Sequence, residues 1–335
     1  MNISRRGFSK LLASASLLPL VGSAGLVHAS QPEPVTLRYL ASQGGLAAHE
    51  LADALGYFDN TGVKLENKGY AAGGPASLFA LASGDIEIGS AATAAVLNSI
   101  AGGNDFVAAY PSNGITKDVE SIFYVLEGSP IKSIKDLVGK TIAVNTLGAH
   151  LDYTVREALH AAGLPQDAAK LVVVPGPQLE QVLRSEQVDV AAFGYWQSTF
   201  EGVARKNGGL RKVFGDTEVL GEIAGGFVVL RRDWIGAHPE AAKTFVEQSA
   251  KALDYARENP DETKKLIAEV LSTRGENPDI AQYFAGYGVR AGGLPVERDL
   301  QFWIDVLVRG GTLKEGQIKV ADVLFDPAKL AGAVN

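Results

Sequence analysis

The chain has 335 residues, of which 46% are hydrophobic and 21% charged, and it contains no cysteine. The absence of cysteine excludes a disulfide framework, a cysteine-ligated metal site, a thiol nucleophile and a lipid anchor on cysteine. The 31 basic and 38 acidic residues give a formal charge of −7, which argues against a nucleic-acid partner because phosphate contacts need a basic surface. The length predicts two lobes rather than one, in a globular α/β protein.

Residues 1–29 carry the pattern of an export signal. Ser4-Arg5-Arg6-Gly7-Phe8, followed by Lys10, resembles a twin-arginine motif. The apolar stretch over residues 11–26 is shorter than the roughly 20 residues that a bilayer span needs. Val27-His28-Ala29 predicts cleavage near Ala29. We expect twin-arginine export to the periplasm and a mature chain that is not lipid-anchored. The alternative is an amphipathic N-terminal helix that stays on the protein.

Strand and helix patterns alternate along the body of the chain. Helical spacing, as in Leu46, Leu51 and Leu55, separates many of the strands. The continuous run Leu171–Val174 is typical of a parallel strand buried on both faces. The pattern predicts a doubly wound α/β architecture. The predicted strands cover residues 35–41, 63–69, 86–89, 106–110, 121–126, 141–145, 171–175, 188–193 and 227–231.

The pattern becomes helical from Pro239 onward. Helices are predicted over residues 239–257, 261–271 and 295–309, with prolines near their starts and Gly310-Gly311 after the last one. Helices that follow two strand-rich blocks indicate that the chain returns to complete its first lobe.

Small and polar residues gather where strands end and helices begin. Open α/β sheets bind ligands beyond the carboxyl ends of their strands, and helix N-termini there favour anions. Each turn taken alone is also compatible with ordinary capping. Together the turns predict a cleft for a small anionic or polar molecule. These turns span residues 42–45, 73–77, 90–93, 111–114, 145–150 and 194–197.

Signals for catalysis or metal binding are weak. His49 and Asp53 are spaced i, i+4, which could ligate a metal but is more typical of a surface pair. Motifs for a nucleophile elbow, a phosphate-binding loop or a dinucleotide fingerprint are lacking. We therefore expect no catalytic residue, no metal and no cofactor. Tyr195 and Trp196 can be interpreted either as an aromatic wall of the cleft or as core residues.

Four passages resemble the solute-binding proteins of ABC importers, in the nitrate, sulfonate and taurine group. The first combines Ala52–Phe58 with Thr61–Leu65, a "G-Y-F … G-[LV]-x-[LV]" pattern. The others are Leu81–Gly89, Ser129–Val144 and Val188–Ala192. The resemblance covers the mature chain to about residue 260. Where members of this group often carry Trp then Pro, this chain has Gly194-Tyr195-Trp196.

The resemblance implies a two-lobed type II periplasmic binding protein fold, each lobe a mixed, mostly parallel sheet flanked by helices. Lobe 1 would comprise residues 35–120 plus 228–335, and lobe 2 residues 121–227. The two lobes would close on a small anionic ligand, an aliphatic sulfonate or a related sulfonate or carboxylate. From the turns and the resemblance we expect ligand contacts at Gln43, Gly45, Gly74, Ser90, Thr93, Asn113, Thr146, Gly148, Ala149, His150, Tyr195 and Trp196.

The same resemblance implies a function in transport. A monomeric, non-enzymatic receptor would deliver its ligand to an ABC permease and its ATPase in the inner membrane. The alternative is an exported α/β hydrolase that acts on a small polar substrate.

Overall fold

The computed structural model describes residues 34–326, which belong to one compact unit. The predicted export signal at residues 1–29 lies outside these described residues. None of the helices within residues 34–326 has the length and hydrophobicity that a membrane crossing requires. We use the name central segment for residues 116–222 and flanking segments for residues 34–115 and 223–326.

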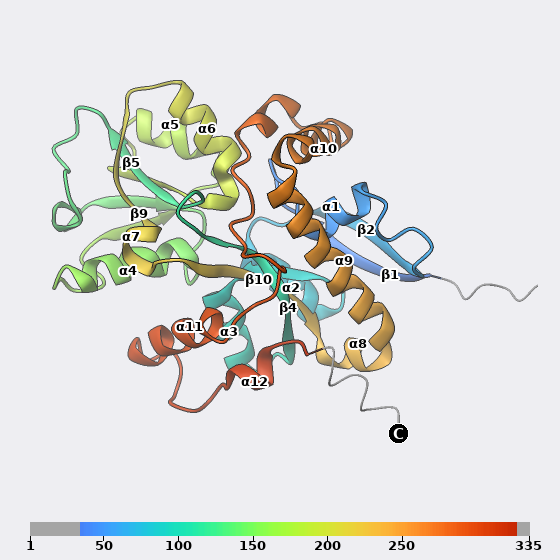
Figure 1. The fold of residues 1–335 in the computed structure, drawn as a ribbon. Coiled ribbons are helices and arrows are strands. Elements are labelled where there is room, and N and C mark those ends of the chain that lie inside the picture. Colours follow the sequence, from blue (N-terminus) through green and yellow to red (C-terminus); the bar gives the residue numbers. More distant parts are fainter. Residues whose placement is uncertain (1–33, 327–335) are drawn as a thin grey trace, which may run out of the picture. The chain divides into compact units, whose positions relative to one another are not determined.

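The flanking segments contribute two sheets and most of the long helices (Figure 1). Their first part contains β1 (Val35–Ala41), α1 (Ala48–Ala54), β2 (Val63–Tyr70), α2 (Gly74–Ser83), β3 (Gly89–Ala92), α3 (Thr93–Ala101) and β4 (Phe106–Ile115). Their second part contains β10 (Ile223–Arg231), α8 (Arg232–Ala237), α9 (Pro239–Glu258), α10 (Pro260–Thr273), η4 (Pro278–Tyr283), α11 (Arg298–Arg309) and α12 (Val320–Val323).

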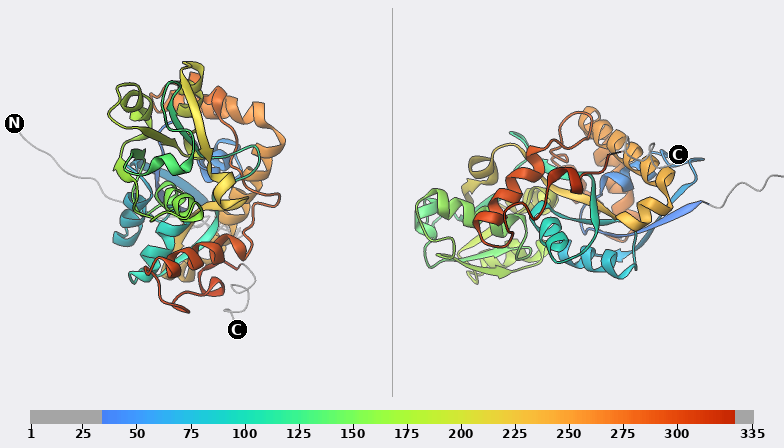
Figure 2. Two further views of the ribbon diagram at one scale, coloured as in Figure 1. Left: turned by 90° about the vertical axis from the view of Figure 1, so that its left-hand side faces the viewer. Right: turned by 90° about the horizontal axis from the view of Figure 1, so that it is seen from below.

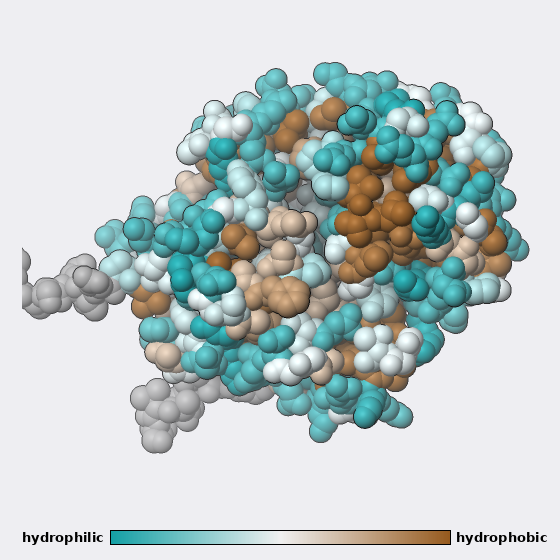
Figure 3. Space-filling view, turned by 180° about the vertical axis from the view of Figure 1, so that it is seen from behind, coloured by the Kyte–Doolittle hydropathy of each residue, from teal (hydrophilic) through white to brown (hydrophobic). Residues whose placement is uncertain are grey.

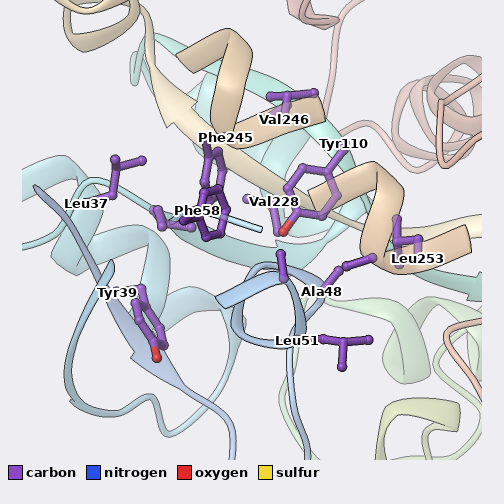
Figure 4. Close-up of a cluster of buried hydrophobic side chains, with 14 of the residues drawn as sticks. Leu37, Tyr39, Ala48, Leu51, Phe58, Tyr110, Val228, Phe245, Val246 and Leu253 are labelled. Atoms are coloured by element: carbon purple, nitrogen blue, oxygen red, sulfur yellow. The ribbon is translucent and has the colours of Figure 1, made fainter. Parts of the chain in front are cut away.

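The C-terminal half of the chain packs onto the N-terminal strands. β10 pairs antiparallel with both β3 and β4, and β1 pairs parallel with β2. α9 covers α1 and α11 packs on α3. Figure 4 shows Phe245 and Val246 of α9 beside Tyr110 and Phe58 in the resulting core. The prediction that the helices after Pro239 return to the first strands agrees with these contacts, whereas the lobe boundaries stay a prediction.

The central segment forms a five-stranded sheet with strand order β7-β6-β8-β5-β9. Helices cover both of its faces: α4 packs into one core cluster and α5 into the other. The two further views in Figure 2 show this segment from the side and from below. Its elements are β5 (Ile122–Leu126), η1 (Ile134–Leu137), β6 (Thr141–Val144), α4 (His150–Ala161), β7 (Lys170–Val173), η2 (Gly176–Gln178), α5 (Leu179–Arg184), β8 (Val190–Phe193), η3 (Tyr195–Gln197), α6 (Ser198–Lys206), β9 (Leu210–Gly215) and α7 (Asp216–Leu220).

Strand pairing is mixed, as predicted. β6 pairs parallel with β7 and β8, whereas β5 pairs antiparallel with β8 and β9. The antiparallel pairs involve β5 and β10, the strands on which the chain enters and leaves the central segment. An apolar run in the sequence predicts a strand but not whether it pairs parallel or antiparallel, because the connection between strands sets their relative direction.

Three strand predictions need correction. The strand predicted over 86–89 begins only at Gly89; Ile86 is buried in the core, and the Glu87 carboxylate accepts a hydrogen bond from the Arg38 backbone N–H (2.8 Å). The run Leu171–Val174 forms an edge strand with β6 as its one partner in the sheet, which leaves Val173 57% exposed. Figure 3, the view from behind, shows hydrophobic residues in brown on its right-hand side, where the central segment lies. β9 was not predicted, because Arg211 and Lys212 interrupt its apolar pattern.

Candidate functional site

A small cavity lies where strands of the central and flanking segments end. Its volume is about 130 Å³. A cavity needs about 10–15 Å³ of such space to hold one water molecule, so this cavity has room for a small ligand. The lining residues are Leu40, Ser42, Ala71, Gly73, Gly74, Ser77, Ser90, Ala91, Ala92, Ser112, Asn113, Asn145, Thr146, Ala149, His150, Tyr195, Trp196 and Gly225.

Three helices begin at this cavity. The N-caps of α2, α3 and α4 are Gly73, Ala92 and Ala149, and all three residues line it. None of these N-caps makes a side-chain hydrogen bond, since glycine and alanine have no acceptor atom to offer. Helix starts are ordinarily capped by Ser, Thr, Asp or Asn, which satisfy N–H groups that have no partner in the helix. The cavity therefore meets three helix N-termini whose positive ends lack a protein side-chain cap.

Hydroxyl and amide side chains complete the wall. The Ser90 backbone N–H donates to Ser77 Oγ (3.0 Å), which fixes the start of β3 against α2. The Tyr195 hydroxyl donates to Asn113 Oδ1 (3.2 Å), across the boundary between the central and flanking segments. Asn145 Oδ1 is buried without a hydrogen-bond partner among the described atoms. These groups offer both donors and acceptors to a polar ligand.

The cavity wall carries no fixed charge of its own. Its described lining includes no Arg, Lys, Asp or Glu, and its ionisable side chains are His150 and Tyr195. Burial raises the pKa of Tyr195 well above its ordinary value, so this hydroxyl stays neutral. An anion in the cavity would therefore be held by dipoles and hydrogen bonds rather than by a permanent ion pair.

His150 is the first residue of α4 and is fully packed. Its Nε2 lies 2.7 Å from Asp216 Oδ2, and both side chains are buried. The second oxygen of Asp216 accepts a hydrogen bond from the Ser121 backbone N–H (2.8 Å). The rings of Trp196 and Trp303 meet the imidazole edge-on, at centroid distances of 5.8 and 5.6 Å. His150 Nδ1 has no partner among the described residues.

Tyr195 and Trp196 serve both roles that the sequence left open. Both line the cavity, and both also pack into hydrophobic clusters. Gly225 provides the room for Tyr195, because a Cβ at position 225 would collide with the tyrosine hydroxyl oxygen. Gly194 does the same for the indole of Trp196, which lies 2.5 Å from an ideal Cβ.

Eight of the expected contact residues line the cavity: Gly74, Ser90, Asn113, Thr146, Ala149, His150, Tyr195 and Trp196. The other four lie elsewhere. Thr93 is buried and donates through Oγ1 to the Ala224 carbonyl (3.4 Å), and the Gly148 N–H donates to Asp152 Oδ2 (2.8 Å). Gln43 and Gly45 belong to the loop at 42–45, of which Ser42 lines the cavity.

That loop is fixed from the far end of the chain. The Gly44 N–H donates to Glu276 Oε2 (2.6 Å), and Arg274 donates to the Gly45 carbonyl (3.1 Å). From the central segment, Thr199 Oγ1 donates to the Gly44 carbonyl (2.9 Å). The loop thus joins segments through bonds to Gly44 and Gly45, and the expected ligand contacts at Gln43 and Gly45 stay a prediction.

Of the possible metal pair, His49 is buried and Asp53 is exposed. His49 is 3% exposed, and its Nδ1 lies 2.9 Å from the Tyr110 hydroxyl, so the interpretation as a surface pair with Asp53 was wrong. Within the described part of the chain, no group of three or more His, Asp or Glu side chains could hold a metal ion.

Comparison with known proteins decides the family. A family model described as NMT1/THI5 like matches residues 46–263, about two thirds of the chain. The chain belongs to the NMT1/THI5-like family. A family relative from Brucella abortus (strain 2308), named as a binding protein, is 24% identical over 277 residues, covering 82% of this chain and 81% of that protein.

Solved structures of periplasmic binding proteins share the fold of this family member. The aliphatic sulphonate binding protein SsuA of Escherichia coli matches with a TM-score of 0.68 at 20% identity, covering 88% of this chain and 93% of its own. SsuA of Xanthomonas axonopodis pv. citri, bound to MOPS, matches with a TM-score of 0.69 at 18% identity, covering 88% of this chain and 99% of its own. The nitrate-binding protein NrtA of Synechocystis PCC 6803 matches with a TM-score of 0.66 at 16% identity, covering 91% of this chain and 90% of its own.

These matches confirm the predicted periplasmic binding protein fold. The proteins named above are binding proteins and not enzymes, which agrees with the expectation of a non-enzymatic chain and not with the hydrolase alternative.

Several lining residues were not named in advance. Ser42, Gly73, Ser77, Ser112 and Asn145 lie inside the predicted turns, so the turn signal already contained them. Gly225, which lines the cavity, and Asp216, the partner of His150, carried no local signal. Gly225 is in the middle of β10, where the neighbouring Gly226 pairs with Asn113, and Asp216 meets His150 from 66 positions away.

Proposed function

We propose that this chain is the solute-binding component of an ABC importer and captures a small organic anion, an aliphatic sulfonate or a related carboxylate. The observation that carries the proposal is the convergence of three helix N-termini, all with Gly or Ala as N-cap, on one cavity. A bound anion would act as the missing cap for these helices. The names of the SsuA and NrtA relatives support the class of ligand.

The capture mechanism follows from the position of the cavity. Lobe 1, residues 35–120 plus 228–335, and lobe 2, residues 121–227, would rotate about the connections between β4 and β5 and between α7 and β10. Closure would bring α2 and α3 from one lobe toward α4 from the other. The ligand would lose its water and gain donors from both sides, which would stabilise the closed form.

The cellular location and the transport partners are also part of the proposal. Residues 1–29 would direct the chain to the periplasm by the twin-arginine route, with cleavage near Ala29. The mature monomer, without a lipid anchor, would pass its ligand to an inner-membrane permease and its ATPase.

A paired ligand test examines the charge requirement. Mature protein from residue 30 onward is titrated with ethanesulfonate and with its neutral analogue, ethyl methyl sulfone; nitrate, taurine and benzoate complete the panel. We expect ethanesulfonate to raise the melting temperature, with roughly 2.7 kcal/mol of added stability at a hundredfold excess over Kd. The sulfone should have little effect. Failure of every anion, or equal binding of the sulfone, would contradict the proposal.

A further inference from the structure

Tyr195 belongs to the walls of two cavities. It lines the ligand cavity of about 130 Å³ and also a second cavity of about 320 Å³. Among the residues that the structure describes, Tyr195 is the one member that the two walls have in common. The cavities are therefore neighbours, and Tyr195 lies between them.

The side chain of Tyr195, and not its backbone alone, forms the wall of the ligand cavity. Its hydroxyl donates to Asn113 Oδ1 (3.2 Å) and occupies the space that a Cβ at Gly225 would fill. Its ring meets the rings of His150 and Trp196 edge-on, at centroid distances of 5.2 and 4.9 Å. All four of these neighbours line the ligand cavity, so they place both the ring and the hydroxyl at its edge.

Tyr195 lies at the buried end of the ligand cavity. Tyr195 and Ala149 are 3% and 4% exposed, whereas Gly73 and Thr146, which also line the cavity, are partly exposed. At that more exposed end the two segments come close, because an ideal Cβ on Gly73 would lie 3.9 Å from Thr146 Cβ. A ligand held at the helix N-termini thus has little room for a tail at the outer end, and Tyr195 closes the inner one.

The second cavity offers a surface that suits a tail. Tyr124 and Phe193 in its wall are buried side chains with large apolar areas. Two of its carboxylates already have partners: Glu120 forms a salt bridge with Lys212 (2.6 Å), and Glu201 accepts a hydrogen bond from the Tyr124 hydroxyl (2.6 Å). Methylene groups that enter such a space are removed from water, which favours binding.

We propose that Tyr195 is the residue that limits ligand size: its side chain closes the ligand cavity and denies the alkyl tail of an anion the space of the second cavity. The protein then selects short-chain sulfonates and carboxylates over long-chain ones. This inference rests on the proposed function, because it assumes that an anionic headgroup is held at the N-termini of α2, α3 and α4.

A series of linear sulfonates measures the limit in the wild-type protein. The mature chain is titrated calorimetrically with ethane-, butane-, hexane- and octanesulfonate, in a buffer that is not itself a sulfonate. We expect octanesulfonate to bind at least about tenfold more weakly than butanesulfonate, because a chain too long for the cavity must displace packed side chains. Equal or tighter binding of octanesulfonate would overturn the inference and leave the proposed function standing. If neither these sulfonates nor nitrate and benzoate bind, both fall together.

Three variants test whether Tyr195 sets this order. Tyr195→Ala removes the side chain between the cavities, so octanesulfonate should now bind more tightly than butanesulfonate, by up to about fourfold per added methylene. Tyr195→Phe loses the hydrogen bond to Asn113 but keeps the ring, and should keep the wild-type order. Tyr124→Ala is the matched control, since it enlarges the second cavity without opening it to the first, and should also keep that order. A reversed order in Tyr124→Ala, or an unchanged one in folded Tyr195→Ala, would contradict the assignment.

A crystal structure of the wild-type protein with butanesulfonate does not depend on how the variants fold. We expect the terminal methyl group within about 4.5 Å of the Tyr195 ring and no ligand atom in the second cavity. A tail that leaves the cavity between Gly73 and Thr146, or that reaches the second cavity past an unmoved Tyr195, would overturn the inference.

Discussion

Two buried histidines, each at the start of a helix, have opposite surroundings. His49 in α1 lies beside Tyr110 and among the rings of Tyr39 and Phe245, in the core that Figure 4 shows. His150 in α4 lies against a buried carboxylate at the edge of a cavity. Each ring has one nitrogen without a partner among the described residues, so an unpaired nitrogen alone does not define a site.

The neighbours decide what each ring can do. Burial, reinforced by the charge of Arg274, lowers the pKa of His49 to about 3, so this ring stays neutral. Its surroundings are a closed aromatic core, and the cavity residues do not include it. At His150 the nearest partner is a carboxylate, and the residue is among those that line the cavity. Burial and residue type are the same, but the sign of the nearest charge and access to the cavity differ.

The largest effect is expected in the His49 region, from its buried ion pair. Arg274 and Glu50 form a salt bridge with side-chain exposures of 10% and 3%. Arg274→Met leaves the carboxylate buried and unpaired, and should lower the free energy of unfolding by about 3–5 kcal/mol. Chemical denaturation measures this loss, and adding Glu50→Gln to the same chain should recover part of it. Ethanesulfonate affinity of the folded variant should not change, since neither residue lines the cavity.

The corresponding change at the His150 site should affect binding instead of stability. Ala149→Asp supplies α4 with a carboxylate cap from the protein itself, in the place proposed for the anion. We expect affinity for ethanesulfonate to fall at least about a hundredfold, or about 2.7 kcal/mol. The free energy of unfolding should be kept or rise by up to about 1 kcal/mol. Ala149→Ser, an uncharged cap, is the control and should lose less affinity; equal affinity of Ala149→Asp and wild type would refute the capping account.

In the absence of ligand, His49 should make the free energy of unfolding fall as the pH is lowered. A histidine with a folded-state pKa of about 3, below the usual unfolded value of about 6.5, binds its proton in the unfolded chain first. Its contribution is therefore fully present above about pH 6.5 and declines by up to about 1.4 kcal/mol per pH unit toward pH 3. Denaturation curves at pH 7, 6 and 5 test this against His49→Gln, in which this part of the slope should disappear. An unchanged slope in the variant would assign the acid sensitivity to other groups.

The smallest effect concerns two buried threonines with similar hydrogen bonds. Thr199 donates to the Gly44 carbonyl across the segments, and Thr93 to the Ala224 carbonyl within the flanking segments. Replacement by valine removes about 0.5–1.5 kcal/mol in either case. If the lobes close as proposed, Thr199→Val should weaken ethanesulfonate binding a few-fold. Thr93→Val should lower stability with little change in Kd; identical effects of both on Kd would argue against a closing contact at Gly44.

Local patterns predicted the fold class and most of the cavity turns. The turns at 73–77, 90–93 and 145–150 were visible because small and polar residues follow apolar strands, and the structure brings residues of all three to one cavity. Ser42 of the loop at 42–45 also lines the cavity, while Glu276 and Arg274 hold Gly44 and Gly45 from more than 220 positions away. His49 matched a surface spacing, but α9 covers α1 and buries it. Long-range packing, which no local spacing encodes, accounts for the burial of His49 and for the missing partner Asp216.

A crystal structure of the mature protein with ethanesulfonate tests the central claim most directly. We predict sulfonate oxygens within about 2.7–3.2 Å of backbone nitrogens in the first turns of at least two of the helices α2, α3 and α4. A sulfonate bound outside this cavity, or held by arginine or lysine side chains, would contradict the account.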